Sequence, residues 1–143
     1  QEKLKIAMFD QTPGTAWLSK SGLSEYGIPY QTMTGDGDNN VAMQIDRDLK
    51  AKKIDMVILW GPMAGYVISQ SPKNTYTVIP MKNSMGVKFD FPMSMGVRRN
   101  DEERKAMLNK LIAKHFDQIQ SLIKSYHVPL LPIDKNAVKK NAD

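Results

Sequence analysis

The chain has 143 residues, of which 41% are hydrophobic, so its length favours one domain with a core of its own. It contains no cysteine, which excludes disulfides, thiolate zinc sites and cysteine nucleophiles. No apolar run approaches the roughly 20 residues that a membrane-spanning helix needs, and we expect a soluble protein. The first residue is Gln1 and no signal-peptide pattern follows it, so we expect a processed chain or a fragment.

The formal net charge of +5 is unevenly distributed. Residues 1–72 carry 7 Lys/Arg and 8 Asp/Glu, whereas residues 73–143 carry 13 and 7. The basic half is compatible with an acidic partner, a membrane surface or nucleic acid, but a solvated helix face with a lysine-rich tail is the simpler interpretation. Aromatic and basic residues are not interleaved, which argues against nucleic acid. We expect the ten methionines to fill gaps in the core.

Strand and helix patterns alternate over the first 70 residues. Residues 4–9 and 28–33 predict short strands, and residues 15–21 predict a helix that ends at Gly22. The polar run 36–40 offers N-cap chemistry for the next helix, whose apolar side chains recur at every fourth position. These β-α steps predict an α/β fold with right-handed crossovers and a parallel sheet.

Residues 53–67 form the most informative segment. The near-continuous apolar run 54–59 is typical of a parallel strand that is covered on both faces. A turn at Trp60, Gly61 and Pro62 follows, and Pro62 suits the first position of a helix that we expect to extend to about Gln70.

The pattern changes after Pro72. Residues 76–81 and 91–98 predict strands, with a loop at 83–90 between them, and Pro92 argues for an edge or crossing position. Asn100, with Glu103 at the capping-box position, predicts one long helix that ends near residue 126. The tail from residue 132 lacks periodicity. The chain therefore divides near residue 90.

A binding site is predicted where the first and third strands end. In a sheet of order 2-1-3 these two ends flank a crevice, and open α/β sheets bind ligands there. Each helix N-terminus at the crevice could hold an anionic or polar group. A simpler alternative is that the threonines cap a helix and both indoles lie in the core. The candidate residues are Gln11, Thr12, Gly14, Thr15, Trp17, Trp60, Gly61 and Pro62.

Metal sites are not favoured by the spacing of possible ligands. Asp36, Asp38 and Asn40 resemble the start of a calcium loop, but Val41 stands where such a loop needs glycine, so helix capping is the better interpretation. His115 and His127 lack a second ligand at helical spacing. Met93 and Met95 share a strand face without a histidine, and we expect them to pack in the core.

Catalytic motifs are also missing from the sequence. It contains no G-x-S-x-G, P-loop, G-x-G-x-x-G or H-E-x-x-H pattern. We therefore do not expect an enzyme.

Gly14-Thr15 and the strand–turn–helix at 54–66, with Ala64 and Tyr66, resemble the second lobe of type II periplasmic solute-binding proteins. In the amino-acid-binding branch, an Asp that grips the ligand's ammonium group usually stands where this sequence has Trp60. The resemblance therefore implies a cleft without the usual amino-acid chemistry, since removing one partner of a buried ion pair costs about 3–5 kcal/mol.

Four segments together resemble the J proteins (MxaJ/XoxJ) that accompany pyrroloquinoline-quinone (PQQ) methanol dehydrogenases: FDQTPGTAWL, ILWGPMAGY, FDFPMSMGVRRND and YHVPLLPI. The resemblance covers about residues 3–133. It implies a periplasmic, solute-binding-like accessory protein and a chain that is only the C-terminal half. Residues 1–90 would form the second lobe, and residues 91–143 the crossover strand, long helix and tail that return to the first lobe.

Under this resemblance the partners are a methanol dehydrogenase and the N-terminal half of the same protein. The PQQ and the metal would belong to the dehydrogenase, and this chain would hold no cofactor. Two other functions stay open: a receptor that delivers a small solute to a transporter, and a small α/β enzyme.

Overall fold

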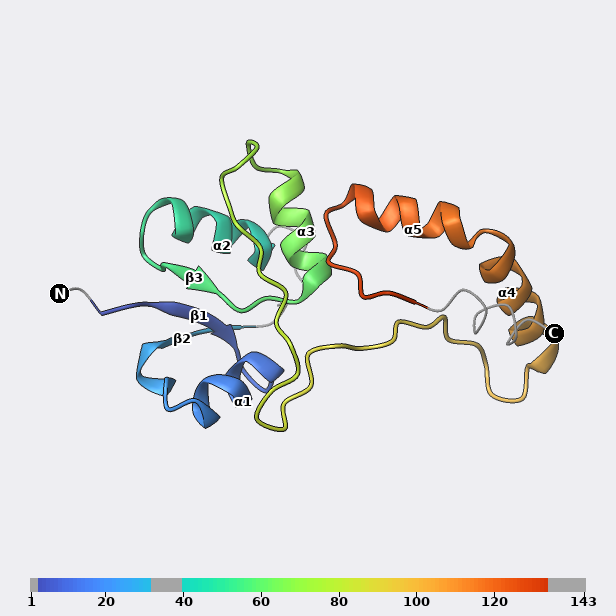
Figure 1. Ribbon diagram of the computed structural model, residues 1–143, viewed down its shortest axis with the longest axis horizontal. Helices are drawn as coiled ribbons and strands as arrows, with labels where there is room; N and C mark the ends of the chain where they lie inside the picture. Colours follow the sequence, from blue (N-terminus) through green and yellow to red (C-terminus); the bar gives the residue numbers. More distant parts are fainter. Residues whose placement is uncertain (1–2, 32–39, 134–143) are drawn as a thin grey trace.

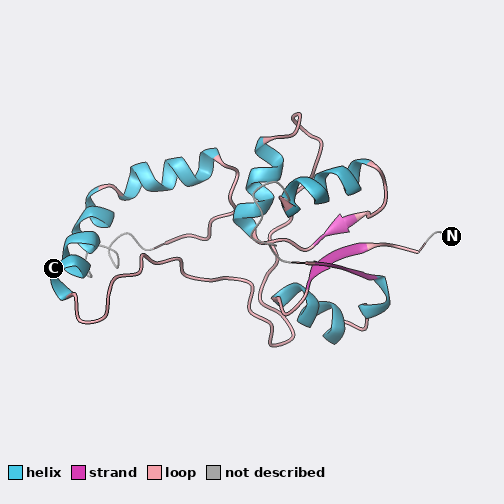
Figure 2. Cartoon of the chain, turned by 180° about the vertical axis from the view of Figure 1, so that it is seen from behind, coloured by secondary structure: helices cyan, strands magenta, loops and turns pink. Residues whose placement is uncertain are grey.

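The computed structural model describes residues 3–31 and 40–133. Figures 1 and 2 show an α/β unit from which two helices extend to one side. The elements are β1 (Ile6–Phe9), α1 (Pro13–Lys20), the 3₁₀ turn η1 (Ser24–Tyr26), β2 (Gly27–Tyr30), α2 (Val41–Lys50), β3 (Met56–Val57), α3 (Gly61–Ser69), α4 (Glu102–Lys114) and α5 (Phe116–Ser125).

The sheet is parallel, as predicted, and its strand order β2-β1-β3 is the one assumed for the binding site. Ile6 pairs with Gly27 on one side and with Met56 on the other. The strand predicted at 54–59 is much shorter, although the Ile58 N–H still donates to the Ala7 carbonyl at 2.9 Å. This strand lies at the edge of the described sheet, so only one neighbour supplies hydrogen bonds to it.

Helices lie on the two sides of the sheet. Ala7 and Phe9 point toward α2 and form a core cluster with Val41, Ile45 and Ile54. Alternation along β1 directs Ile6 to the other face, where α1 packs on the strand.

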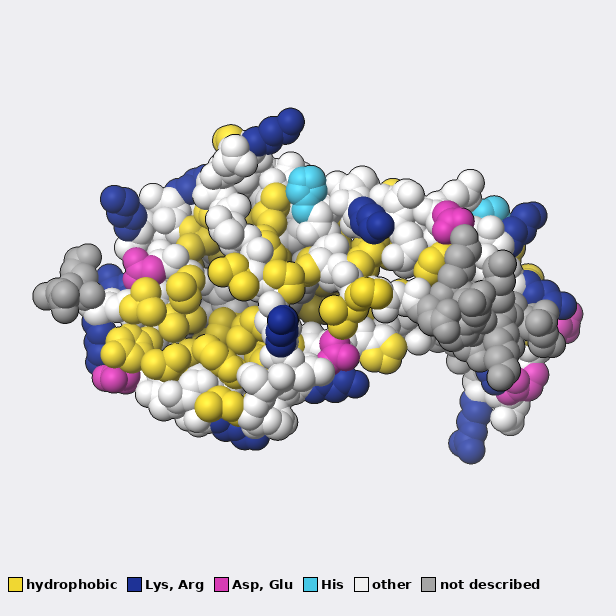
Figure 3. Space-filling model, in the orientation of Figure 1, with side chains coloured by type: hydrophobic (Ala, Val, Ile, Leu, Met, Phe, Trp, Pro, Cys, Tyr) yellow, Lys and Arg dark blue, Asp and Glu magenta, His cyan; other side chains and the backbone are white. Residues whose placement is uncertain are grey.

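The expectation that β3 is covered on both faces is wrong. Met56 is 48% exposed, and Figure 3 shows hydrophobic side chains gathered over the sheet on one face of the molecule. The position of β3 at the edge of the described sheet accounts for this exposure. Part of the apolar surface of this strand is thus left open.

Two local signals act as the sequence predicts. The Asn40 side chain caps α2 by accepting from the Ala42 N–H at 3.0 Å. Gly22 has φ of +70° and follows α1, and the Leu23 N–H returns to the Leu18 carbonyl, which is a Schellman end. The cap and the helix end each depend on only a few neighbouring residues, so the sequence pattern is enough to predict them.

The strands predicted at 76–81 and 91–98 are wrong. Neither range contains a strand in the described structure. Residues 91–98 leave the α/β unit and run to α4 (Figure 1). Both ranges have β-prone composition, but a strand forms only where a neighbour offers its backbone groups, and in the described residues none does so here.

The single long helix is also wrong, because it divides at His115 into α4 and α5. The imidazole Nδ1 lies 2.7 Å from Gln118 Oε1, three residues on, but the His115 side chain does not cap the second helix. Neither helix contains a buried residue, so packing against a core does not favour one continuous helix. We call residues 102–125 the arm.

The expectation that the methionines fill gaps in the core is confirmed only for Met63, which is partly buried and packs against the core cluster. No described methionine belongs to the buried core. Met93 is 72% and Met95 is 60% exposed, because residues 91–98 do not join the sheet. These thioethers therefore do not fill gaps in this core.

Candidate functional site

The predicted site lies at the carboxyl ends of β1 and β3, which are neighbours in the sheet. We call residues 10–15 and 60–62 the strand-end site. A Cβ added to Gly14 would lie 2.7 Å from Ile58 Cγ2, so the first turn of α1 presses against the end of β3. The structure thus brings the two predicted segments together, and Gly14 permits their close approach.

The two threonines brace the turn after β1. The Thr12 hydroxyl donates to the Phe9 carbonyl at 2.7 Å, and the Thr15 hydroxyl donates to the same oxygen. Their protons are therefore committed within the chain, although each oxygen can still accept a hydrogen bond. Gln11 is exposed, with φ of 59°.

Both helices at the site begin without a side-chain cap. Thr12 precedes α1 and Trp60 precedes α3, and neither side chain accepts a hydrogen bond from the first turn. The first helical bonds are those of the Ala16 and Ala64 N–H groups, at 3.2 and 3.0 Å. Within the described residues the earlier N–H groups of each helix have no hydrogen-bond partner, so a polar or anionic group could accept from them, with about 0.3–1 kcal/mol from the helix dipole for each charge.

The two indoles differ in exposure. Trp60 is 57% exposed at the start of α3, whereas Trp17 is half-buried within α1. An exposed indole beside open N–H groups suits a ligand or partner with a flat apolar part. Pro62 occupies the second position of α3, one residue later than predicted, because the helix begins at Gly61.

The sequence reasoning missed the segment that follows α5. A Cβ on Gly61 would lie 3.2 Å from the Pro129 ring and 4.0 Å from Val128, so these residues border the strand-end site. The signal available in the sequence is a pair of glycines, Gly61 and Gly65, one turn apart on one helix face.

A buried carboxylate behind the site was also missed. Asp46 of α2 is 7% exposed and accepts from Lys50 at 2.7 Å, from Tyr76 at 2.7 Å and from Ser71 at 3.2 Å. Burial alone would raise the pKa of Asp46, but these hydrogen bonds outweigh it and hold the pKa below its usual value. Burial and the bond to Asp46 raise the pKa of Tyr76 to about 12.

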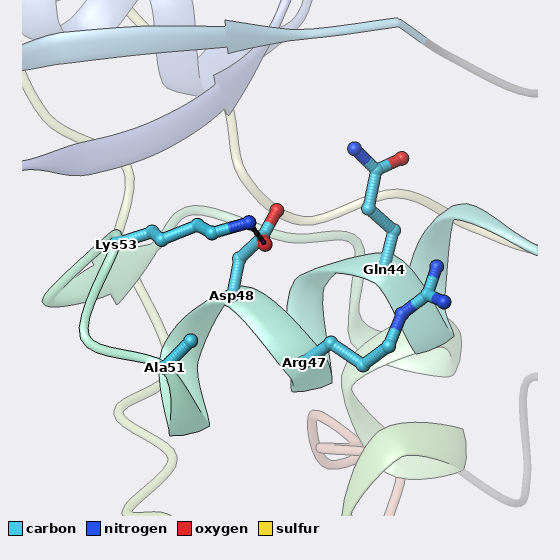
Figure 4. A pocket seen from close by; sticks show the side chains of 5 residues that line it. All are labelled: Gln44, Arg47, Asp48, Ala51 and Lys53. Atoms are coloured by element: carbon cyan, nitrogen blue, oxygen red, sulfur yellow. Dashed lines mark ion pairs between the residues drawn. The ribbon is translucent and has the colours of Figure 1, made fainter.

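A second carboxylate lies in an open pocket on the outside of α2 (Figure 4). The pocket has a volume of about 460 Å³ and is lined by Gln44, Arg47, Asp48, Ala51 and Lys53. Lys53 pairs with Asp48 at 3.2 Å, and the Tyr30 hydroxyl donates to Asp48 at 2.8 Å.

Ala51 and Lys53 precede β3, so the pocket lies toward the amino ends of the strands and away from the strand-end site. Its lining is polar and open to solvent, as expected of a hydrated surface hollow. We therefore do not assign it a ligand.

Possible metal ligands and membrane-spanning helices were compared with the described residues. No group of three or more His, Cys, Asp or Glu in residues 3–31 and 40–133 is arranged to hold a metal ion. His115 instead contacts Gln118, while Asp36 and Asp38 lie outside the described residues. No helix in the described part of the chain is long and apolar enough to cross a membrane.

Among curated proteins, the chain is similar to Protein MoxJ of Methylorubrum extorquens (strain AM1). The two are 30% identical over 134 residues, which cover 85% of this chain and 45% of MoxJ. The chain thus spans about half the length of the curated relative it matches. No family profile matches the chain, and no solved structure matches it significantly.

Proposed function

We propose that this chain is part of a non-catalytic accessory protein of methanol oxidation, which engages a PQQ-dependent methanol dehydrogenase. The similarity to MoxJ over 85% of the chain carries the proposal. The PQQ and its metal belong to the dehydrogenase in this proposal. We assign the protein to the periplasm, the compartment that the family resemblance implies.

The proposal includes a solute-binding-like architecture in two lobes. Residues 1–90 form the second lobe, and residues 91–143 return to a first lobe that the rest of a longer protein supplies. The apolar side chains of the arm support this division: Met107, Leu111 and Leu122 are 49%, 44% and 62% exposed. So many exposed apolar residues on two helices mark a surface that another structure covers. More than half of MoxJ lies outside the matched region, which leaves room for a lobe of that kind.

The strand-end site is the surface that we assign to the dehydrogenase. Trp60 stands at the position where the amino-acid-binding relatives usually carry an acidic grip, and its indole is exposed. Aromatic side chains are frequent anchors at protein interfaces because they bury a large area at little entropic cost. This interpretation explains why position 60 carries an exposed indole in place of an acidic side chain.

Titration calorimetry with purified methanol dehydrogenase tests the proposal on the longer protein. We expect binding in the absence of any small ligand, and a loss of at least tenfold in affinity, or about 1.4 kcal/mol, for Trp60→Ala. Ile79→Ala is the control, because Ile79 is 79% exposed and lies within residues 1–90 but outside the strand-end site. A Trp60→Ala variant that only lowers the melting temperature contradicts the assignment of Trp60.

A solute receptor for a transporter is the second candidate, favoured by the open N–H groups at the two helix starts. Micromolar binding of a small solute, with no binding of the dehydrogenase, would replace the accessory function with this one. A small α/β enzyme is a third and weaker candidate, and turnover of a substrate by the longer protein would be needed to support it.

A further inference from the structure

One face of α3 is in unusually close contact with the chain that leaves the arm. A Cβ on Gly65 would lie 2.2 Å from the carbonyl oxygen of Tyr126, 3.2 Å from the Val128 nitrogen and 3.3 Å from the His127 carbonyl carbon. All three atoms belong to the backbone, so no side chain can rotate away to make room. Only glycine fits at position 65 without moving residues 126–128.

The contact extends along the helix to its first residue. Gly61 lies one turn before Gly65, and a Cβ there would be 3.2 Å from both Cγ and Cδ of Pro129. This approach is tight but less severe than the one at Gly65. We call Gly61 and Gly65 the glycine face of α3.

A glycine within a helix costs about 1 kcal/mol relative to alanine, so Gly65 weakens α3 locally. Close packing against residues 126–128 offsets that cost. Gly65 is buried, which agrees with a packing role.

The position of this contact links two distant parts of the molecule. Tyr126 directly follows α5, so residues 126–129 carry the end of the arm, while Trp60 of the strand-end site directly precedes Gly61. The other connection to the arm, residues 91–98, forms no strand and exposes Met93 and Met95. The glycine face is therefore the closely packed contact between the α/β unit and the chain leaving the arm.

We propose that the glycine face sets the position of the arm relative to the α/β unit, and that it couples this position to Trp60. When residues 126–129 lie on Gly61 and Gly65, the arm is held and Pro129 covers one side of the first turn of α3. When they are displaced, the arm is released and the surroundings of Trp60 change. Gly65 is thus a positioning residue, whether the strand-end site binds a protein or a solute.

Distance measurement between two spin labels tests the first part. The chain has no cysteine, so Gln44→Cys on α2 and Lys110→Cys on α4 give one defined label pair on the 143-residue chain. We expect Gly65→Ala to broaden and shift the distance distribution, and Gly61→Ala to do so less. Gly96→Ala is the matched control, since no atom lies within 4 Å of its added Cβ, and we expect no change.

Emission from Trp60 tests the coupling, in a Trp17→Phe background that leaves a single indole. We expect Gly65→Ala to shift the emission maximum, and Gly96→Ala to leave it unchanged. An arm that moves while the Trp60 emission stays constant overturns the coupling. Unchanged spin-label distances in Gly65→Ala overturn the whole proposal.

A further measurement distinguishes displacement of the arm from unfolding of the α/β unit. Hydrogen exchange at β1 reports the α/β core, and we expect the same protection in all the variants. If Gly65→Ala loses that protection, Pro129→Ala replaces it, because this change removes the ring from Gly61 without crowding α3. A Pro129→Ala variant with the parent's distances and emission then contradicts the proposal.

Discussion

Asp46, the buried carboxylate in the middle of α2, ties three parts of the chain together. Its partners are Lys50 on the same helix, Ser71 after α3 and Tyr76 in the segment that follows. Asp46→Ala leaves the Tyr76 hydroxyl without its short acceptor, and we expect it to lower the free energy of unfolding by about 1–3 kcal/mol. Urea denaturation measures this loss. Tyr76→Phe removes only the contacts of the phenol with Asp46 and leaves those of Lys50 and Ser71, so an equal loss in the two variants would contradict a shared network.

The same carboxylate predicts a response to acid. Because the folded-state pKa of Asp46 is below its ordinary value, the stabilisation is complete above about pH 4 and is lost as pH falls through the folded-state pKa. We expect Asp46→Asn to have a flatter stability profile than the parent below about pH 4. Thermal unfolding across acidic buffers measures the slope, and parallel profiles would contradict this role.

Tyr30 and Tyr76 predict a response to base. Burial, followed by hydrogen bonds to Asp48 and Asp46, raises the pKa of each phenol to about 12. Since the folded state holds these protons more tightly, the stabilisation is complete below about pH 10 and is lost as the pH rises toward 12. A pH titration followed by phenolate absorbance counts the tyrosines that ionise late. Tyr30→Phe and Tyr76→Phe should each have one such tyrosine fewer than the parent. A variant that retains both late groups would show that the phenol assigned to it is wrong.

The structure has Asp101 as the N-cap of α4, whereas the sequence predicted Asn100. Asp101 accepts from the Arg104 N–H at 3.2 Å, whereas Asn100 has φ of 65° and cannot act as an N-cap. Asp101→Ala should destabilise the first turn of α4 by about 0.5–2 kcal/mol, seen as faster hydrogen exchange at the Arg104 amide. Asn100→Gly is the control, because glycine adopts positive φ freely, and we expect it to leave that amide unchanged. Faster exchange in the control alone would favour the original prediction.

Elements whose determinants are local were predictable, and elements that depend on a partner were not. The cap at Asn40 and the glycine end at Gly22 need only neighbouring residues. The parallel sheet follows from the alternation of strand and helix patterns, because parallel strands need a crossover between them. The ranges 76–81 and 91–98 have strand-like composition, but composition does not reveal whether an adjacent strand is present.

The candidate site was predictable for a similar reason, but only in part. The ends of strands and the starts of helices can be located from periodicity. For this reason residues 10–15 and 60–62 could be predicted to lie at one site. The hydrogen bonds that commit Thr12 and Thr15 to Phe9, and the approach of Pro129 to Gly61, depend on geometry that no spacing encodes. The exposure of Trp60 likewise depends on the whole arrangement.

At the scale of the whole molecule, the arm exposes apolar side chains that a stable protein normally covers. Leu122 and Tyr126 of the segment at the end of the arm are 62% and 52% exposed. In the 143-residue chain we expect Leu122→Gln to reduce concentration-dependent association, because less apolar surface is available for contact between copies. Sedimentation velocity measures the association, and Lys124→Gln, on the same helix, is the control.

The longer protein should respond to Leu122→Gln in the opposite sense. If the remainder of that protein covers α5, the new amide is buried in an apolar contact, and we expect a loss of about 1–3 kcal/mol in the free energy of unfolding. Lys124→Gln should cost less than about 0.5 kcal/mol, because a surface substitution away from such contacts has little effect. Chemical denaturation of both variants gives the comparison. Equal stabilities would mean that Leu122 stays exposed in the longer protein, and the return of residues 91–143 to a first lobe would then be incorrect.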